Sequence, residues 1–172
     1  MNPLHYRIER CLSDINLIEV TSMLHRAYAP LAAAGMNYIA ATQTPDMTEA
    51  RLASSTASWT ARLDDRIIGL VSYYARIEYP NVPALYYKDH VGVFAQLAVE
   101  PQYQKRGIGY ALIKTVEEHA AGEGKSELVC DTAENATHLR DYYARLGFRE
   151  IATHCWPNGA YKSIIFSKQL NG

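Results

Sequence analysis

The sequence lacks the features that mark membrane and secreted proteins. No stretch of the 172 residues approaches the roughly 18 uninterrupted apolar residues that a membrane-spanning helix needs. The N-terminal segment MNPLHYRIERCL has no basic flank followed by an apolar run, which a secretory signal requires. These absences predict a cytoplasmic protein with no membrane partner.

Cysteine and net charge are also scarce. Cys11, Cys130 and Cys155 stand far apart, without the CxxC pairs of a zinc site or the density of a disulfide scaffold. We therefore expect reduced thiols and no metal, and His154 beside Cys155 is too isolated to suggest a metal site. The net charge of −1 offers no basic field for a polyphosphate backbone, so no nucleic-acid partner is expected.

What is present is an ordinary globular composition, 48% apolar and 20% charged, in a length that suits a single domain over 1–172. Hydrophobic periodicity and turn signals predict strands and helices that alternate only in the second half of the chain. The strands are expected at 6–12, 58–63, 66–78, 91–99, 126–131, 148–156 and 160–170, and the helices at 15–31, 44–55, 107–122 and 136–147. This order predicts an α/β (α+β) fold with a mixed sheet and helices on both faces.

Local signals set the expected ends of some elements. Ser13 or Asp14 is suited to cap the first helix, and Pro30 and Gly35 mark its end. The stretch YPNVPALYYKDH, residues 79–90, contains two prolines and is expected to be a loop.

The stretch QLAVEPQYQKRGIGYALIKTVEEHA, residues 96–120, joins a strand to a helix through two glycines. Gly107 and Gly109 each cost about 0.5–1 kcal/mol relative to alanine in a helix, so a ligand is one explanation for them. The helix is amphipathic and packs on the sheet, which leaves its N-terminal N–H groups near the strand end as an anion site. Since Lys105 and Arg106 add positive charge, the turn suits a diphosphate.

The turn also resembles other glycine-containing motifs. A dinucleotide fingerprint needs a third glycine where Leu112 stands, although Asp131 at the end of the next strand keeps that idea open. The segment HAAGEGKS is no P-loop, because His119 replaces the first glycine and the segment leads from a helix into a strand. A lone GxG also occurs in ordinary strand-to-helix connections.

Two longer segments carry a family resemblance. Residues 96–113, QLAVEPQYQKRGIGYALI, resemble the acetyl-CoA signature of the GNAT superfamily of N-acetyltransferases, Q/R-x-x-G-x-G/A after a strand. Residues 134–150, ENATHLRDYYARLGFRE, resemble the second signature of that family. In that signature, an asparagine follows the fifth strand, and a tyrosine then stands four residues before a glycine-aromatic pair. Tyr143 and Gly147-Phe148 fill the places of the tyrosine and the pair. The element order also fits over 6–170.

The resemblance implies a mixed, mostly antiparallel central sheet of about seven strands flanked by about four helices. In that fold the fourth and fifth strands splay apart and hold the pantetheine arm of acetyl-CoA between them. Leu97 and Val99 would supply backbone partners to the pantetheine, and Tyr143 and Asn135, the latter displaced by one position from its usual spacing, would also bind the cofactor. The diphosphate would be cradled by Gln104, Lys105, Arg106, Gly107, Ile108, Gly109 and Tyr110.

The implied activity is that of an acetyl-CoA-dependent N-acetyltransferase, an acyltransferase acting on a small-molecule or peptide amine. Tyr143 would protonate the leaving thiolate, since a phenol with a pKa near 10 suits that role. The alternative is a core residue, because Leu139, Tyr143 and Leu146 share helical spacing. A catalytically silent CoA-binding sensor or interaction module stays open, because Val93 stands where some relatives carry a glutamate. A homodimer also stays open.

No general base is evident in the sequence. Asp89 and His90 lie just upstream of the fourth strand and could activate an amine through water. We expect the amine to lose its proton to water, directly or through a water chain that ends at His90. Glu100 precedes Pro101 at the strand end and is interpreted as solvated.

Tyrosines gather in segments that surround the acceptor side of this fold. Strand propensity explains them slightly better than a substrate cage does, so the identity of the acceptor is not predicted. The set comprises Tyr28, Tyr38, Tyr73, Tyr74, Tyr79, Tyr86 and Tyr87.

Overall fold

The computed structural model describes residues 4–11, 13–78, 80–157 and 161–170, which contain seven strands, four α-helices and three 3₁₀ segments. The strands are β1 (Arg7–Arg10), β2 (Ala57–Leu63), β3 (Arg66–Tyr74), β4 (Val91–Val99), β5 (Glu127–Ala133), β6 (Arg149–Cys155) and β7 (Lys162–Gln169). The helices are α1 (Leu17–Ala33), α2 (Pro45–Ala53), α3 (Ile108–Gly122) and α4 (Thr137–Arg145), with η1 (Ile39–Ala41), η2 (Ala84–Tyr87) and η3 (Pro101–Tyr103). None of these helices combines the length and apolarity needed to cross a bilayer.

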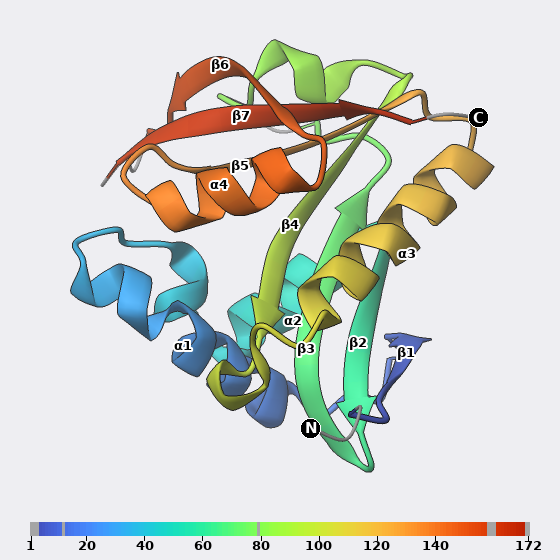
Figure 1. Cartoon of the computed structure of the whole chain (residues 1–172), viewed down its shortest axis with the longest axis vertical. Coiled ribbons are helices and arrows are strands. Elements are labelled where there is room, and N and C mark those ends of the chain that lie inside the picture. The colour runs from blue at the N-terminus through green and yellow to red at the C-terminus, as the bar shows by residue number, and fades with distance from the viewer. Residues whose placement is uncertain (1–3, 12, 79, 158–160, 171–172) are drawn as a thin grey trace.

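The strands form one sheet in the order β1-β2-β3-β4-β5-β7-β6, and every described pair is antiparallel except β4 with β5. Those two strands pair in parallel only at Val91–Val93 and Glu127–Val129. They then run on to Val99 and Ala133 along diverging paths (Figure 1). The sheet therefore opens at its centre, and the predicted fold class is confirmed.

Helices cover both faces of this sheet, as the sequence predicts (Figure 1). On one face, Leu112 and Val116 of α3 pack in the main core with Phe94 and Phe166 of the sheet, and α4 adds Tyr143. On the other face, α1 packs on β3 and β4 through a separate apolar cluster. Burial of each large aliphatic side chain in such clusters stabilises the fold by about 1.5–3 kcal/mol.

Gly35 follows the C-cap of α1 at a φ of +82°, as the sequence predicts, whereas the N-cap and the position of Pro30 differ from the prediction. Its N-cap is Asn16, whose side-chain oxygen accepts a hydrogen bond of 3.1 Å from the third helical N–H, and not Ser13 or Asp14. Pro30 does not end the helix but lies inside its last part. Because the fixed φ of proline is close to a helical value and only one hydrogen bond is lost, α1 continues past this residue.

The stretch 79–90 was expected to be a loop, but its described part, residues 80–90, contains η2. Tyr86 of this segment is only 1% exposed and packs with Val91, Val93 and Val129. Its hydroxyl donates a hydrogen bond of 3.0 Å to Asp131 at the far end of β5. The segment is therefore attached to the sheet on both sides of the point where β4 and β5 diverge.

Candidate functional site

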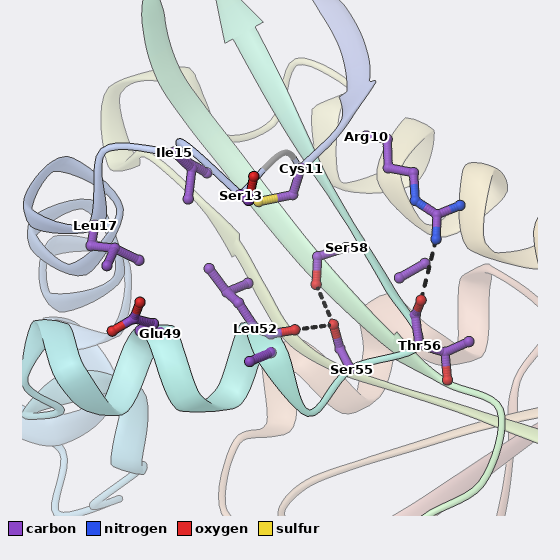
Figure 2. Close-up of a pocket in the computed structure, with 12 residues that line it drawn as sticks. Arg10, Cys11, Ser13, Ile15, Leu17, Glu49, Leu52, Ser55, Thr56 and Ser58 are labelled. Carbon is purple, nitrogen blue, oxygen red and sulfur yellow. Dashed lines mark hydrogen bonds between the residues drawn. The ribbon is translucent and has the colours of Figure 1, made fainter.

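A cavity of about 300 Å³ lies between the end of β1, α2 and the start of β2 (Figure 2). Its walls include Arg10 and Leu52, and the hydroxyl groups of Ser55 and Ser58 meet at 2.9 Å on one side of it. None of the residues that the sequence predicts for cofactor binding lines this cavity. Those residues lie instead around the opening between β4 and β5.

A β-bulge bends β4 at this opening. Leu70 of β3 faces Ala98, whereas Ser72, two residues further on, faces Ala95, so β4 contains one extra residue. Gln96 lies in the bulge and has a φ of +54°. This left-handed conformation costs a residue with a side chain about 1–2 kcal/mol. The bulge increases the local bend and helps β4 to turn away from β5.

The side chain of Gln96 is anchored in a series of buried hydroxyl groups. Its Nε2 donates to Ser72 Oγ at 3.1 Å, and Ser58 Oγ donates to the same oxygen at 2.8 Å. Ser55 extends the series to the cavity of Figure 2. Gln96 Oε1 is buried and has no hydrogen-bond partner in the described part of the chain. The bulge is thus held from the side of α2.

Beyond the bulge, Leu97 and Val99 face the side from which β5 has departed. The Leu97 carbonyl accepts a hydrogen bond of 3.0 Å from the Tyr28 hydroxyl, and the Val99 carbonyl accepts one of 3.1 Å from Gln104 Nε2. Both carbonyls are thus already occupied by side chains, and an extended ligand that pairs with β4 as an added strand would use the second lone pair of each oxygen or replace these side chains. Contact of Leu97 and Val99 with a cofactor stays a prediction.

The glycine turn forms the N-terminus of α3. Gly107 is the N-cap at φ +83°, and Lys105 is also left-handed at φ +61°. No side chain caps the first N–H groups of α3 and no acidic residue lies in its first turn. A Cβ on Gly107 would meet nothing within 4 Å, whereas one on Gly109 would lie 2.9 Å from Tyr142 Oη. Gly107 is therefore required by conformation, and the uncapped N–H groups suit an anion.

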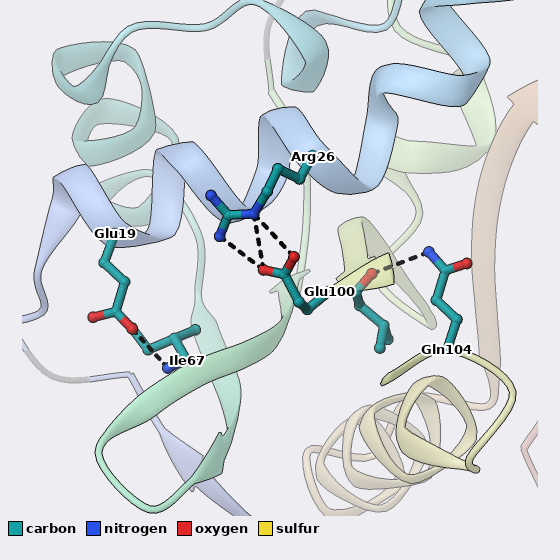
Figure 3. Close-up of polar contacts among 6 residues, drawn as sticks. Glu19, Arg26, Ile67, Glu100 and Gln104 are labelled. Carbon is teal, nitrogen blue, oxygen red and sulfur yellow. Dashed lines mark hydrogen bonds and ion pairs between the residues drawn. The ribbon is translucent and has the colours of Figure 1, made fainter. Parts of the chain in front are cut away.

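An ion pair fixes the chain just before this turn (Figure 3). Both carboxylate oxygens of Glu100 bind the Arg26 guanidinium of α1, at 2.7 to 3.1 Å. Glu100 is 6% exposed, so its interpretation as a solvated residue is wrong. The reason is tertiary, because α1 brings Arg26 across the end of β4. Glu19 on the same helix accepts the Ile67 N–H at 2.8 Å and holds β3 in the same way (Figure 3).

The remaining residues predicted for the turn surround it. Ile108 is 1% exposed and belongs to the main core, whereas Tyr110 is 51% exposed. Lys105 and Arg106 are exposed, and neither forms an ion pair with another described residue. Their charges are therefore available to an anion at the N-terminus of α3. Asn135 is exposed before α4.

Tyr143 is a core residue as well as a candidate acid. Its ring packs against Phe94, Phe148 and Phe166, with ring centroids 5.4 to 6.0 Å apart. Its hydroxyl makes no hydrogen bond to any residue that the structure describes. Burial raises the pKa of Tyr143 well above its usual value, with smaller contributions from neighbouring groups including Cys130. The phenol therefore keeps its proton at neutral pH, which is the form a general acid needs.

The family position for a glutamate on β4 is apolar here, but a carboxylate stands on β5. Val93 is 2% exposed and pairs with Val129. Asp131 is two residues further along β5, so it lies on the same face as Val129. Its Oδ1 accepts from the Tyr86 hydroxyl, and its Oδ2 from Trp156 Nε1 at 3.2 Å and Ser163 Oγ at 2.8 Å. From the sequence, Asp131 was a candidate only for a dinucleotide site, although strand alternation places it on the same face as Val129.

Tyrosines bridge the opening on the side of α1. Tyr38 packs between Tyr28 and Tyr161, at ring-centroid distances of 5.3 and 4.8 Å. The Tyr38 hydroxyl lies 2.7 Å from Thr132 Oγ1 and accepts the Ala133 N–H at 2.8 Å. Together with the bond from Tyr28 to β4, these contacts connect the two separated strands.

The other tyrosines of the predicted set lie elsewhere or play different parts. Tyr73 lies in the core on the α3 side, where its hydroxyl donates to Glu123 at 2.8 Å. Tyr74 donates to the carbonyl of Arg51 at 3.2 Å. Tyr79 lies outside the described residues. Of the predicted set, only Tyr28 and Tyr38 therefore belong to the aromatic cluster that bridges the opening. The third member of this cluster, Tyr161, was not predicted.

His90 is distant from the opening. It directly precedes β4, its side chain is 56% exposed, and its Nε2 lies 3.6 Å from Glu127 at the start of β5. Leu97 is seven residues further along, about 23 Å at a rise of about 3.3 Å per residue. This distance does not favour His90 as a base acting directly on an amine.

A split sheet with an uncapped glycine turn at the split is the architecture of GNAT-type acyltransferases. The chain matches the acetyltransferase (GNAT) family model over residues 23–148 and belongs to this family. The comparison with curated proteins found no match.

Solved structures with low sequence identity share the fold. A GNAT-family acetyltransferase from Staphylococcus aureus Mu50 is 15% identical, with 97% of this chain and 100% of that chain covered and a TM-score of 0.72. The ribosomal-protein-S18-alanine N-acetyltransferase from Escherichia coli is 14% identical, with 98% and 96% covered and a TM-score of 0.66. An aminoglycoside 6'-N-acetyltransferase complexed with coenzyme A is also 14% identical, with 96% and 98% covered and a TM-score of 0.66.

Proposed function

We propose that the whole chain forms one domain that transfers an acetyl group from acetyl-CoA to an amine of a small molecule or peptide. The opening between β4 and β5, which ends at the uncapped N-terminus of α3, carries the proposal. The diphosphate would bind the N–H groups of the turn, and Lys105 and Arg106 would add charge. The pantetheine would lie along Leu97 and Val99. The coenzyme A complex of a protein with this fold supports the assignment.

The reaction requires a nucleophilic amine and a protonated leaving group. The amine nitrogen attacks the thioester carbonyl carbon, and a β4 N–H stabilises the resulting oxyanion. The carbon–sulfur bond then breaks, and the coenzyme thiolate takes a proton from Tyr143, either directly or through a bridging water. Tyr143 regains its proton from solvent. The amine releases its own proton, so the products are an amide and a thiol.

Asp131 is the residue we propose for that released proton. It is a carboxylate on the proposed acceptor side, and its hydrogen-bond partners Tyr86, Trp156 and Ser163 are all neutral donors. Asp131 would thus take the role of the carboxylate that is missing at Val93. The missing carboxylate was the reason to keep a catalytically silent CoA-binding module as an alternative function. Water remains the alternative acceptor for the proton.

Two measurements test this function together. Acetyl-CoA at about 100 times its dissociation constant adds about 2.7 kcal/mol to the native state, which for this size raises the melting temperature by about 5–10 °C. NAD should give no shift. Thiol release from acetyl-CoA should then depend on an added amine. A shift with NAD alone would support the dinucleotide interpretation, and a shift with acetyl-CoA but no amine-dependent release would support the silent module.

A further inference from the structure

The carboxylate of Asp131 is half-buried and has no ion-pair partner among the described residues. Glu100 and Glu117, which are more deeply buried, form ion pairs with arginine or lysine, whereas the half-buried Glu19 accepts a backbone N–H of β3 instead. Asp131 is partly buried and contacts no cation among the described residues, since its partners Tyr86, Trp156 and Ser163 are neutral. Because sheltering an uncompensated charge is costly, such a carboxylate suits a cationic ligand.

Arg51 presents the opposite case. It is partly buried on α2, and no carboxylate pairs with it in the described part of the chain. Its Nη1 donates to the side-chain oxygen of Gln43, which is 1% exposed and itself donates to Thr48 at 2.7 Å. The guanidinium is therefore oriented by a buried network and keeps further N–H donors for an anion.

Both charges act on the same tyrosines. Burial has the largest effect and raises the pKa values of Tyr28 and Tyr161. Beneath it, Arg51 lowers both values and Asp131 raises both, so each charge lies within electrostatic range of both hydroxyl groups. Tyr38 packs between these two rings. The contacts agree with this placement. The Arg51 carbonyl accepts a hydrogen bond of 3.2 Å from Tyr74, and Tyr74 packs in one cluster with Tyr86, which donates to Asp131. A cation and an anion without ion-pair partners among the described residues thus lie near the same part of the opening.

We propose that the acceptor carries an anionic group, such as a carboxylate, in addition to its amine. Asp131 binds the ammonium end beside the opening, and Arg51 binds the anionic group by a charge-assisted, bidentate contact. The cluster of Tyr28, Tyr38 and Tyr161 supplies the apolar and aromatic wall between them. This inference rests on the proposed acetyl transfer and restricts the class of acceptor. Amino acids and related compounds are favoured over polyamines and aminoglycosides.

Matched pairs of amines test the proposal. The pairs are phenylalanine with phenethylamine, tyrosine with tyramine and lysine with cadaverine, and kanamycin serves as a polycation without an acid. Binding is measured by calorimetry on the CoA-loaded protein, and turnover by thiol release. We expect at least one acid-bearing amine to exceed its decarboxylated partner by tenfold or more in affinity or kcat/KM.

Variants assign the preference to the two charges. In the best pair, Arg51→Met should reduce the ratio of affinity or kcat/KM between the acid-bearing amine and its decarboxylated partner to near one. The reason is that the substitution lowers the affinity or kcat/KM of the acid-bearing amine alone. Arg51→Lys should keep part of it, since the charge remains. Asp131→Asn should weaken both members of the pair. Arg66→Met, at an exposed arginine at the start of β3, is the matched control and should change nothing.

The outcomes separate this proposal from the proposed function. If acetyl-CoA and CoA fail to bind, the function itself is wrong. If CoA binds and kanamycin or the decarboxylated amines match or exceed every acid-bearing partner, or if no acid-bearing amine binds, the substrate class is wrong. A preference that survives unchanged in Arg51→Met, with the variant's melting temperature retained, also overturns it.

Discussion

The two sides of the opening between β4 and β5 are built from different material. On the donor side, the bulge, the strand end and the glycine turn come from the continuous stretch 96–110 and present mainly backbone groups. On the side that we propose for the acceptor, the groups are side chains from separate segments: Tyr28, Tyr38, Arg51, Asp131 and Tyr161. A site made of backbone suits a ligand portion that many related proteins share, whereas a site made of side chains can differ between relatives without loss of the fold.

The largest expected effect breaks the donor side alone. Gly109→Glu should abolish the thermal shift with acetyl-CoA, because the new carboxylate occupies and repels the diphosphate position. The variant should still fold, because the one close contact of the added Cβ, at 2.9 Å, is with the tip of the Tyr142 side chain, and the Val99 methyl at 3.8 Å is at ordinary packing distance. Differential scanning fluorimetry measures both effects.

Gly122→Glu adds the same charge at the other end of α3, where a Cβ meets nothing within 4 Å. This control should keep the thermal shift. An undiminished shift in Gly109→Glu would place the diphosphate elsewhere.

Tyr143→Phe tests the group between the two sides. We expect kcat to fall by about 10²-fold or more with little change in coenzyme affinity, as for loss of a general acid. The melting temperature should stay nearly constant, because the ring packing remains and the hydroxyl has no hydrogen bond to the described residues. Steady-state thiol release and thermal unfolding check the two parts.

Tyr142→Phe is the neighbouring control, and it should affect kcat less, since Tyr142 lies about 100° away around α4. An unchanged kcat in Tyr143→Phe would make Tyr143 a packing residue only.

Asp131→Asn breaks the acceptor side alone. A carboxylate must be ionised to accept a proton, so kcat/KM for the amine should rise with pH in the native protein through an acid limb. In the variant we expect that limb to disappear and the rate to fall by about 10- to 10²-fold, while the shift with acetyl-CoA persists. The measurement is a pH profile at subsaturating amine.

His90→Ala should keep the limb, because His90 lies at the opposite end of β4. The reverse result, with the limb lost only in His90→Ala, would restore a histidine route through water. A profile without any acid limb, rising toward the pKa of the acceptor amine, would favour deprotonation by water.

The smallest effect concerns stability at alkaline pH. Burial raises the pKa of Tyr142 to about 12 and also raises the pKa values of Tyr28 and Tyr161. In the unfolded chain these phenols ionise near pH 10, so above that pH the unfolded state loses protons that the folded state retains. Stability should therefore be unaffected by these groups below about pH 10 and fall as pH rises toward 12.

Urea unfolding at pH 8, 10 and 11 measures this dependence. Tyr28→Phe on the acceptor side should make the decline shallower, whereas replacing the exposed Tyr110 by phenylalanine should leave it unchanged. A free energy of unfolding that is flat up to pH 11 would contradict the protected state of these hydroxyl groups.

Particular residues show where inference from the sequence succeeds. The turn from Gln104 to Tyr110 could be located because its residues are contiguous and their conformational demands, such as the positive φ of Gly107, are local. Glu100 was misinterpreted because its partner Arg26 is 74 positions away. Asp131 was undervalued for the same reason, since Tyr86, Trp156 and Ser163 come from three other segments. Pro30 was misjudged because one lost hydrogen bond is a smaller effect than the packing of α1.

The sequence by itself determined the order of the strands and helices, the split of the sheet implied by the family signatures, and the glycine turn. These features depend on hydrophobic periodicity and on backbone conformation, both of which are properties of neighbouring residues. Only the tertiary structure decided that Val93 is covered by η2 and that Asp131 stands on the adjacent strand. It also decided that Tyr38 bonds to the end of β5, next to Asp131, and packs between Tyr28 and Tyr161. The reason is physical: the interaction of charges and aromatic rings depends on distance in space, and β5, α1 and α2 bring together residues that the chain keeps far apart.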